Sequence, residues 1–227
     1  ERVIKMGEQP GKVFLTGCPS IDLAEEILQS EKLDFDVFKK YGGVGKDLNL
    51  SNGYIVVMQH PVTTEYDQSR AHIHHTLTAI HQLNIPTLWF WPNVDAGADG
   101  TSKGIRVFRE QNDCSNLHFF KNMEPDHFLK LLNGSQCLVG NSSVGIRECA
   151  YLGVPVVNIG SRQAGRERGQ NVIDTGYSTQ EVTLAINQQI KHGHYKPDKI
   201  YGDATAGIQI ANILAKEALS FDKKLSY

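Results

Sequence analysis

The chain has 227 residues, with 23 basic and 25 acidic side chains and a formal net charge of -2. A charge this close to zero offers no general attraction for a polyphosphate backbone, so we expect no nucleic-acid partner. Any phosphate must be recognised by a few aimed donors. Hydrophobic residues make up 40% of the chain, enough for the core of one large domain. No apolar run approaches the roughly 20 residues of a membrane span, and no membrane partner is expected.

Cysteine and histidine spacings give no sign of a metal centre. The four cysteines are far apart and form no CxxC pair, which favours reduced packing residues in a cytoplasmic protein over disulfides or a zinc site. The run from His72 to His75 places its imidazoles on different faces of a helix. We therefore expect neither a metal nor a cofactor.

Short β-rich apolar runs alternate with longer stretches of helical periodicity, the pattern of repeated βαβ units. Strands are predicted at residues 12–16, 54–59, 87–91, 117–120, 137–139 and 154–159. Helices are predicted at residues 65–83, 103–112, 125–133, 144–152, 179–191 and 204–219. Residues 17–20 are expected to form a turn, 31–52 a weakly patterned connection, and 221–227 a loose charged tail. The fold class is α/β, a doubly wound, Rossmann-like parallel sheet covered on both faces.

The most informative motif runs from a buried strand into a helix through two hydroxyl side chains. Ser142 and Ser143 stand at the helix start, where unpaired N–H groups can hold a phosphate, and Gly140 and Gly145 would let it approach closely. Glu148, one turn further, could accept two hydrogen bonds from a ribose diol. The alternative is structural, with Ser142 as a helix N-cap and Glu148 as a first-turn charge that complements the helix dipole.

Two further polar side chains follow predicted strands at the same edge of the sheet. His60 ends the strand at 54–59, where an imidazole titrating near neutrality could hydrogen-bond or protonate a leaving phosphate. Arg162 follows the strand at 154–159, and its planar fork suits a phosphate or a uracil carbonyl. A structural histidine and a surface ion pair are the competing interpretations. The turns that contain Asn93 and Met123 also reach this edge and could read a base.

Five motifs, in order along the chain, together resemble the hydrolysing UDP-N-acetylglucosamine 2-epimerases, including the epimerase part of the bifunctional animal enzyme. They lie at residues 59–64, 92–97, 140–148, 158–163 and 200–203. The resemblance implies the C-terminal half of a two-domain glycosyltransferase-B fold. Residues 1–20 would end the N-terminal domain and cross over, 21–203 would form the UDP-binding domain, and 204–227 the C-terminal helix and tail.

The resemblance also implies a UDP-sugar substrate, a missing N-terminal domain and a homo-oligomer at full length. The family chemistry is elimination of UDP to a glycal, followed by addition of water. His60 would act in catalysis as well as in UDP binding. The positions that match UDP-binding residues of the family are His60, Asn93, Met123 (through its backbone), Ser142, Ser143, Glu148 and Arg162.

Several alternatives stay open at this point. A UDP-diacetamido-sugar 2-epimerase, a UDP-sugar glycosyltransferase and a non-catalytic nucleotide-sugar-binding module would share the same nucleotide site. The non-hydrolysing epimerases fit less well, because their motif after the strand reads His-Arg-Arg-Glu-Asn where this chain has residues 60–64 as His-Pro-Val-Thr-Thr. Since most catalytic carboxylates of the family lie in the N-terminal domain, we expect this chain alone to bind UDP weakly and to turn nothing over.

Overall fold

The computed structural model describes residues 1–29 and 33–218. Within them, seven strands form one sheet in the order β1-β4-β3-β2-β5-β6-β7. The strands are β1 (Val44–Gly45), β2 (Ile55–Met58), β3 (Thr87–Phe90), β4 (Leu117–Phe120), β5 (Cys137–Gly140), β6 (Val156–Ile159) and β7 (Val172–Thr175). The α-helices are α1 (Arg2–Lys5), α2 (Pro19–Gln29), α3 (Val37–Tyr41), α4 (Ser69–Leu83), α5 (Ala98–Gln111), α6 (Pro125–Asn133), α7 (Ser143–Ile146), α8 (Glu148–Leu152), α9 (Thr179–His192) and α10 (Ala206–Lys216). Two 3-10 helices, η1 (Pro10–Lys12) and η2 (Thr63–Gln68), complete the set.

The sheet is doubly wound, as predicted. All neighbouring strands pair in parallel except β1, which is antiparallel to β4. The chain winds outward from β2 through β3 to β4 and then returns to place β5 on the other side of β2. The strand order therefore reverses between β2 and β5, and open α/β sheets bind ligands at such a switch point, beyond the carboxyl ends of the strands.

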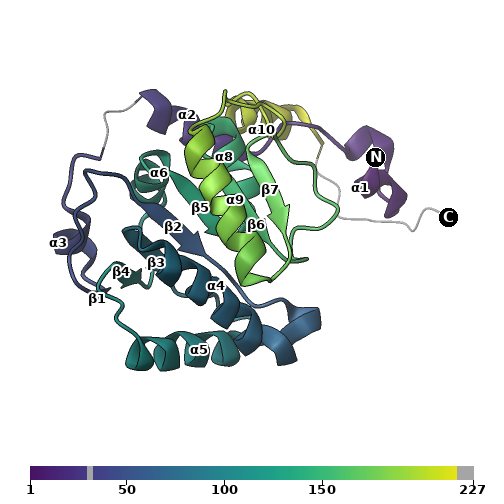
Figure 1. Cartoon of the computed structure of the whole chain (residues 1–227). Coiled ribbons are helices and arrows are strands. Elements are labelled where there is room, and N and C mark those ends of the chain that lie inside the picture. The colour runs from purple at the N-terminus through teal and green to yellow at the C-terminus, as the bar shows by residue number, and fades with distance from the viewer. Residues whose placement is uncertain (30–32, 219–227) are drawn as a thin grey trace.

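Helices cover both faces of the sheet (Figure 1). Alternation along β2 shows the two layers, because Ile55 and Val57 pack with α4, α5 and α9 while Val56 packs with α2, α6 and α8. All three side chains are fully buried. Strands buried on both faces read as continuous apolar runs rather than as alternating ones, which is why the sequence identified them. No helix among the described residues has the length and apolar character needed to cross a membrane.

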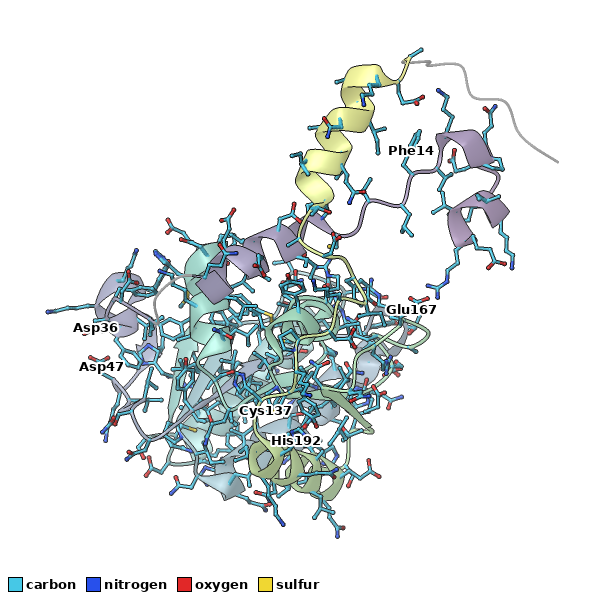
Figure 2. All side chains as sticks on the ribbon, turned by 90° about the horizontal axis from the view of Figure 1, so that it is seen from above. Phe14, Asp36, Asp47, Cys137, Glu167 and His192 are labelled. Carbon is cyan, nitrogen blue, oxygen red and sulfur yellow. The ribbon has the colours of Figure 1, made fainter. Side chains whose placement is uncertain are left out.

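The predicted strand at residues 12–16 is wrong. η1 occupies its start, and the rest is an extended segment that pairs with no strand of the described sheet. An apolar run becomes a strand only where a neighbour accepts its backbone hydrogen bonds, and here Leu15 is 97% exposed. The segment runs away from the body beside α10, and an ion pair between Lys12 and Glu217 at 2.9 Å joins the two (Figure 2).

The single helix predicted at residues 144–152 is also wrong. α7 and α8 are separate helices, because the backbone of Arg147 between them departs from ideal helical geometry, with φ -101° and ψ -76°. The turn expected at 17–20 leads straight into α2, and the connection at 31–52 contains α3 and β1. β7 was not predicted, and α10 is shorter at both ends than the predicted 204–219. The tail expected at 221–227 lies outside the described residues.

Candidate functional site

The carboxyl ends of β2, β3, β4, β5 and β6 meet at one edge of the sheet, because these strands are parallel. The loops that leave this edge carry most of the residues singled out from the sequence. His60 follows β2, Asn93 follows β3 and Met123 follows β4. Ser142 follows β5 and Arg162 follows β6. Candidate binding residues from the loops after five strands therefore lie at one edge of the sheet.

Asn141, which follows β5 directly, holds three of these loops together. Its Oδ1 accepts a hydrogen bond from the backbone N–H of His60 at 2.8 Å, and its Nδ2 donates to the carbonyl of His60 at 2.9 Å. The carbonyl of Asn141 accepts from Arg162 Nη1 at 3.3 Å and from Gln163 Nε2 at 2.8 Å. Asn141 is almost fully buried. Sequence analysis gave it no role, although an amide side chain directly after a buried strand was a usable signal.

His60 is a buried, neutral imidazole. Its Nδ1 accepts a hydrogen bond from the backbone N–H of Asn93 at 3.1 Å, so the neutral ring carries its proton on Nε2. Burial, followed by the nearby positive charge of Arg162, lowers the pKa of His60 to about 4, while Asp95 opposes the shift. The expectation of an imidazole titrating near neutrality is therefore wrong for the free chain. At neutral pH His60 is a hydrogen-bond donor and not a proton source.

The hydroxyl pair stands at the start of α7. Ser142 is its N-cap and accepts a long hydrogen bond of 3.5 Å from the backbone N–H of Val144. Ser142 and Ser143 are both half-buried. Because α7 has four residues, the local N–H groups rather than a long helix dipole would attract an anion here.

The two glycines of this motif serve packing. Gly140 has φ +134°, and a Cβ there would overlap the backbone carbonyl of Met58 in the neighbouring strand β2. A Cβ on Gly145 would press against Val156 at 2.9 Å. Both glycines bring protein segments together, and a ligand is not needed to explain them. Close approach of a phosphate at these glycines stays a prediction.

Glu148 is a buried carboxylate that is only half satisfied. It is 6% exposed and begins α8. Its Oε1 lies 3.3 Å from Nη2 of Arg147, whereas Oε2 has no hydrogen-bond partner among the described residues. A buried acceptor without a donor costs about 1–3 kcal/mol, so an outside donor such as a hydroxyl would stabilise it.

Arg162 lines an open hollow next to His60. Its Nη2 lies 3.5 Å from Oδ2 of Asp95, and both side chains are partly exposed. The hollow has a volume of about 520 Å³. Its lining consists of Pro61, Val62, Thr63, Thr64, Asp95, Ser161 and Arg162. Asp95 was not predicted as a site residue, although it belongs to the turn at residues 92–97.

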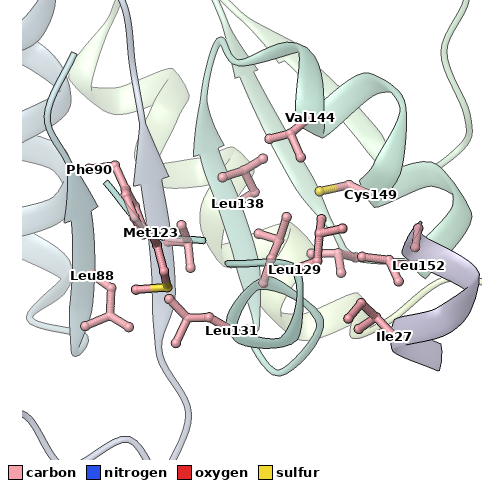
Figure 3. Packing of buried hydrophobic residues seen from close by; sticks show 14 of the residues in the cluster. Ile27, Leu88, Phe90, Met123, Leu129, Leu131, Leu138, Val144, Cys149 and Leu152 are labelled. Carbon is pink, nitrogen blue, oxygen red and sulfur yellow. The ribbon is translucent and has the colours of Figure 1, made fainter. Parts of the chain in front are cut away.

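Met123 and Asn93 present different groups at this edge. The Met123 side chain is buried in the apolar layer with Phe90 and Leu129, so only its backbone is available to a ligand (Figure 3). Asn93 is exposed, and its backbone N–H is already used by His60. Its side-chain amide therefore remains the group with which it could read a base.

Two other features lie near this edge or near α2. Glu124, Asp126 and His127 place potential metal ligands within 4.8 Å of one another, but Nε2 of His127 lies 3.0 Å from the Lys40 ammonium, which opposes a cation. A larger hollow of about 620 Å³ is lined by residues 15–18 and 200–203, together with Glu167 and Gln209. None of the predicted UDP-binding residues lines this larger hollow.

Comparison with known proteins decides the family. The sequence model of the UDP-N-acetylglucosamine 2-epimerase family matches residues 1–215. The chain belongs to this family. It is 30% identical over 203 residues to the UDP-N,N'-diacetylbacillosamine 2-epimerase (hydrolyzing) of Legionella pneumophila, covering 89% of this chain and 51% of that protein. It is 28% identical over 201 residues to the UDP-N-acetylglucosamine 2-epimerase of Neisseria meningitidis serogroup B, covering 88% and 50%.

Solved structures of epimerases share the fold. The Neisseria meningitidis UDP-GlcNAc 2-epimerase bound to UDP-GlcNAc superimposes with a TM-score of 0.68 at 19% identity, covering 95% of this chain and 58% of that one. The Methanocaldococcus jannaschii enzyme, in complex with UDP-GlcNAc and UDP, gives a TM-score of 0.66 at 14% identity, covering 95% and 58%. The chain spans about half the length of the curated relatives it matches.

Proposed function

We propose that this chain is the UDP-binding half of a hydrolysing UDP-N-acetylglucosamine 2-epimerase, which converts UDP-GlcNAc and water to ManNAc and UDP. The observation that carries the proposal is Glu148, whose buried Oε2 lacks a partner within the described structure. A carboxylate in this state, five residues after Ser143 at the edge where the sheet order reverses, suits a ribose diol beside a diphosphate.

Each candidate ligand has a distinct part in this proposal. Ser142 and Ser143 would hold the diphosphate through their hydroxyls and backbone N–H groups, and Arg162 would add a charged fork. His60 would donate a hydrogen bond from its Nε2–H to a phosphate oxygen as the bond to the sugar breaks, stabilising the departing UDP without transferring the proton. Asn93 and the backbone of Met123 would read the uracil.

The hydrolysing reaction is favoured by the relative from Legionella pneumophila, whose name specifies hydrolysis. The name of that relative also supports a second candidate substrate, a UDP-sugar with two acetamido groups. The groups assigned here would contact the nucleotide and not the sugar substituents, so both substrates would suit the same site. A UDP-sugar glycosyltransferase or a binding module without catalysis would use the same nucleotide contacts.

The sugar-side chemistry would require the half that the longer relatives possess. Apolar side chains on the projecting N-terminal segment and on α10 are exposed, among them Met6 at 82%, Ile208 at 66% and Leu214 at 62%. A second domain packed there would remove this apolar surface from water. Tested alone, residues 1–227 are expected to bind UDP and to release none from UDP-GlcNAc.

Calorimetric titration with UDP tests the nucleotide assignment. Glu148→Gln should weaken UDP binding by about tenfold to a hundredfold, because charge-assisted hydrogen bonds to the ribose are lost. Glu181→Gln is the matched control, since Glu181 is also a first-turn carboxylate, on α9, where it accepts from the backbone N–H of Gly176 at 3.1 Å. Equal UDP affinity in wild type and Glu148→Gln would contradict the assignment.

Product analysis separates the candidate reactions. This chain would be fused to the half of a relative that it does not match. The fusion protein would be incubated with UDP-GlcNAc and, separately, with UDP-N,N'-diacetylbacillosamine in ¹⁸O-labelled water. The proposal expects free ManNAc with the label at C1, because water adds to the sugar after UDP has left. Intact UDP-sugar epimerised at C2 would indicate the non-hydrolysing reaction, and transfer to an added acceptor would indicate a glycosyltransferase.

A further inference from the structure

Glu65 is a carboxylate outside the proposed ligand set that joins two loops of the site. It lies in η2, five residues after His60, and has a non-helical backbone with φ -129° and ψ 25°. Its Oε1 accepts a hydrogen bond from Oγ of Ser161, and its Oε2 accepts one from the hydroxyl of Tyr177 at 2.8 Å. Ser161 immediately precedes Arg162. One side chain therefore connects the loop after β2 with the loop after β6.

The Tyr177 end of this connection is rigid. The Tyr177 ring stacks on His72 of α4 with centroids 3.4 Å apart and planes 4° from parallel. Gly160, with φ +74°, also lies against Tyr177, because a Cβ there would overlap the Tyr177 hydroxyl and ring. Nδ1 of His72 also approaches Oε2 of Glu65, at 3.8 Å. The ring has no room to swing, so its hydroxyl presents a fixed donor to Glu65.

Glu65 is ionised across the neutral range. Hydrogen bonds from Ser161 and then from Tyr177 hold the pKa of its carboxyl below the ordinary value. Hydrogen bonds to a charged acceptor are stronger than neutral ones. Burial first, and then the hydrogen bond to Glu65, raise the pKa of the Tyr177 hydroxyl. The phenol therefore keeps the proton that it donates to Glu65.

Arg162 has few other constraints on its position. One nitrogen donates to the carbonyl of Asn141 at 3.3 Å and another lies 3.5 Å from Asp95, both long for hydrogen bonds. The position of the Arg162 guanidinium therefore depends strongly on the backbone of its neighbour Ser161. A shift of about 1 Å in a charged group can greatly weaken its contribution to a site.

We infer that Glu65 is a positioning residue that fixes the Ser161–Arg162 segment against the loop of His60. Arg162 can then bind the diphosphate without a rearrangement of this segment. The inference rests on the proposed UDP site for its ligand but on the observed hydrogen bonds for its structure. It predicts that Glu65 acts on phosphate recognition through Arg162 and leaves the uridine part of the site unchanged.

Two variants and one control test this inference in the full chain. Glu65→Leu removes both acceptors at similar size, and Glu65→Gln retains one and guards against misfolding of the first. Glu25→Leu is the control, because Glu25 also accepts a tyrosine hydroxyl, that of Tyr151 at 2.8 Å, away from the loops of His60 and Arg162.

Hydrogen exchange of the free chain gives the readout that needs no ligand. Backbone amides at residues 160–166 should exchange at least several-fold faster in the Glu65 variants and at the wild-type rate in Glu25→Leu. Unchanged exchange there would overturn the inference even if UDP binds. If UDP does not bind the wild type, the proposed function fails, whereas the exchange measurement still decides whether Glu65 fixes the segment.

Binding of UDP and of uridine gives the second readout. Glu65→Leu should weaken UDP binding by about tenfold, with uridine affinity unchanged. In an Arg162→Ala background the same substitution should have almost no further effect on UDP, because the group that it positions is gone. Additive losses in the double variant, or an equal loss for uridine, would overturn the inference in favour of a general structural role.

Discussion

Substitution of His60 by Asn should remove a loss of stability that the wild type shows in mild acid. The pKa of His60 lies at about 4 in the folded chain, against an ordinary value of 6.5. As pH falls below about 6.5, the unfolded chain therefore binds a proton that the folded chain refuses. The stability contributed by the neutral imidazole is fully present above pH 6.5 and is lost as pH falls towards 4.

The size of this effect follows from the two pKa values. Each pH unit between them costs about 1.4 kcal/mol of unfolding free energy, so the full loss reaches about 3.4 kcal/mol. At pH 5 the loss is about 2 kcal/mol, and at pH 7.5 it is close to zero. Since small domains have a net stability of roughly 5–15 kcal/mol, a change of this size is measurable.

Urea unfolding at pH 7.5 and at pH 5 would measure it. Asn at this position keeps an acceptor near Nδ1 for the backbone N–H of Asn93, and it does not titrate. The wild type should lose about 2 kcal/mol more than His60→Asn between the two pH values. His74→Asn removes an exposed imidazole from α4 as a control. Parallel pH dependences in wild type and His60→Asn would refute the argument that His60 is buried and neutral.

Three further substitutions or reactions test the packing around the site. Gly140→Ala should destabilise the chain by several kcal/mol in a urea titration, since both its φ and the carbonyl of Met58 oppose a Cβ. Asn141→Ala should cost about 2–5 kcal/mol in the same assay, because two buried backbone groups of His60 lose their partners. The thiol of Cys149 is fully buried and its pKa is raised by burial, so a thiol reagent at pH 8 should modify it at the rate of unfolding and not at the rate of an exposed thiol.

The sheet could be predicted because its strands are buried on both faces. Continuous apolar runs at β2, β3 and β5 need no knowledge of their neighbours to be recognised. The run at residues 12–16 has the same composition, but pairing decides a strand, and pairing is a property of distant segments. β1 illustrates the reverse case, since two exposed residues form a strand only because β4 lies beside them.

The residues at the carboxyl ends of the strands could likewise be predicted, whereas the hydrogen bonds between the loops that follow them could not. His60, Ser142 and Arg162 each follow a visible strand, so parallel topology alone brings them to one edge. Nothing local reveals that Asn141 joins the loop of His60 across 81 residues of sequence, or that Glu65 reaches Ser161 across 96. These contacts depend on the strand order, which becomes known only with the fold.

The protonation state of His60 bears on the diphosphate site proposed at this edge. The positive charge of Arg162 helps to keep the imidazole neutral, and Asp95 opposes it. A bound diphosphate would pair with Arg162 and bring its own negative charge beside Nε2, which removes one cause of the low pKa and adds an opposite one. With the proposed diphosphate bound, the pKa of His60 would therefore rise towards its ordinary value. An imidazole that is neutral in the free site and donates its Nε2–H hydrogen bond to a phosphate oxygen would stabilise the departing charge without leaving a buried charge in the empty site.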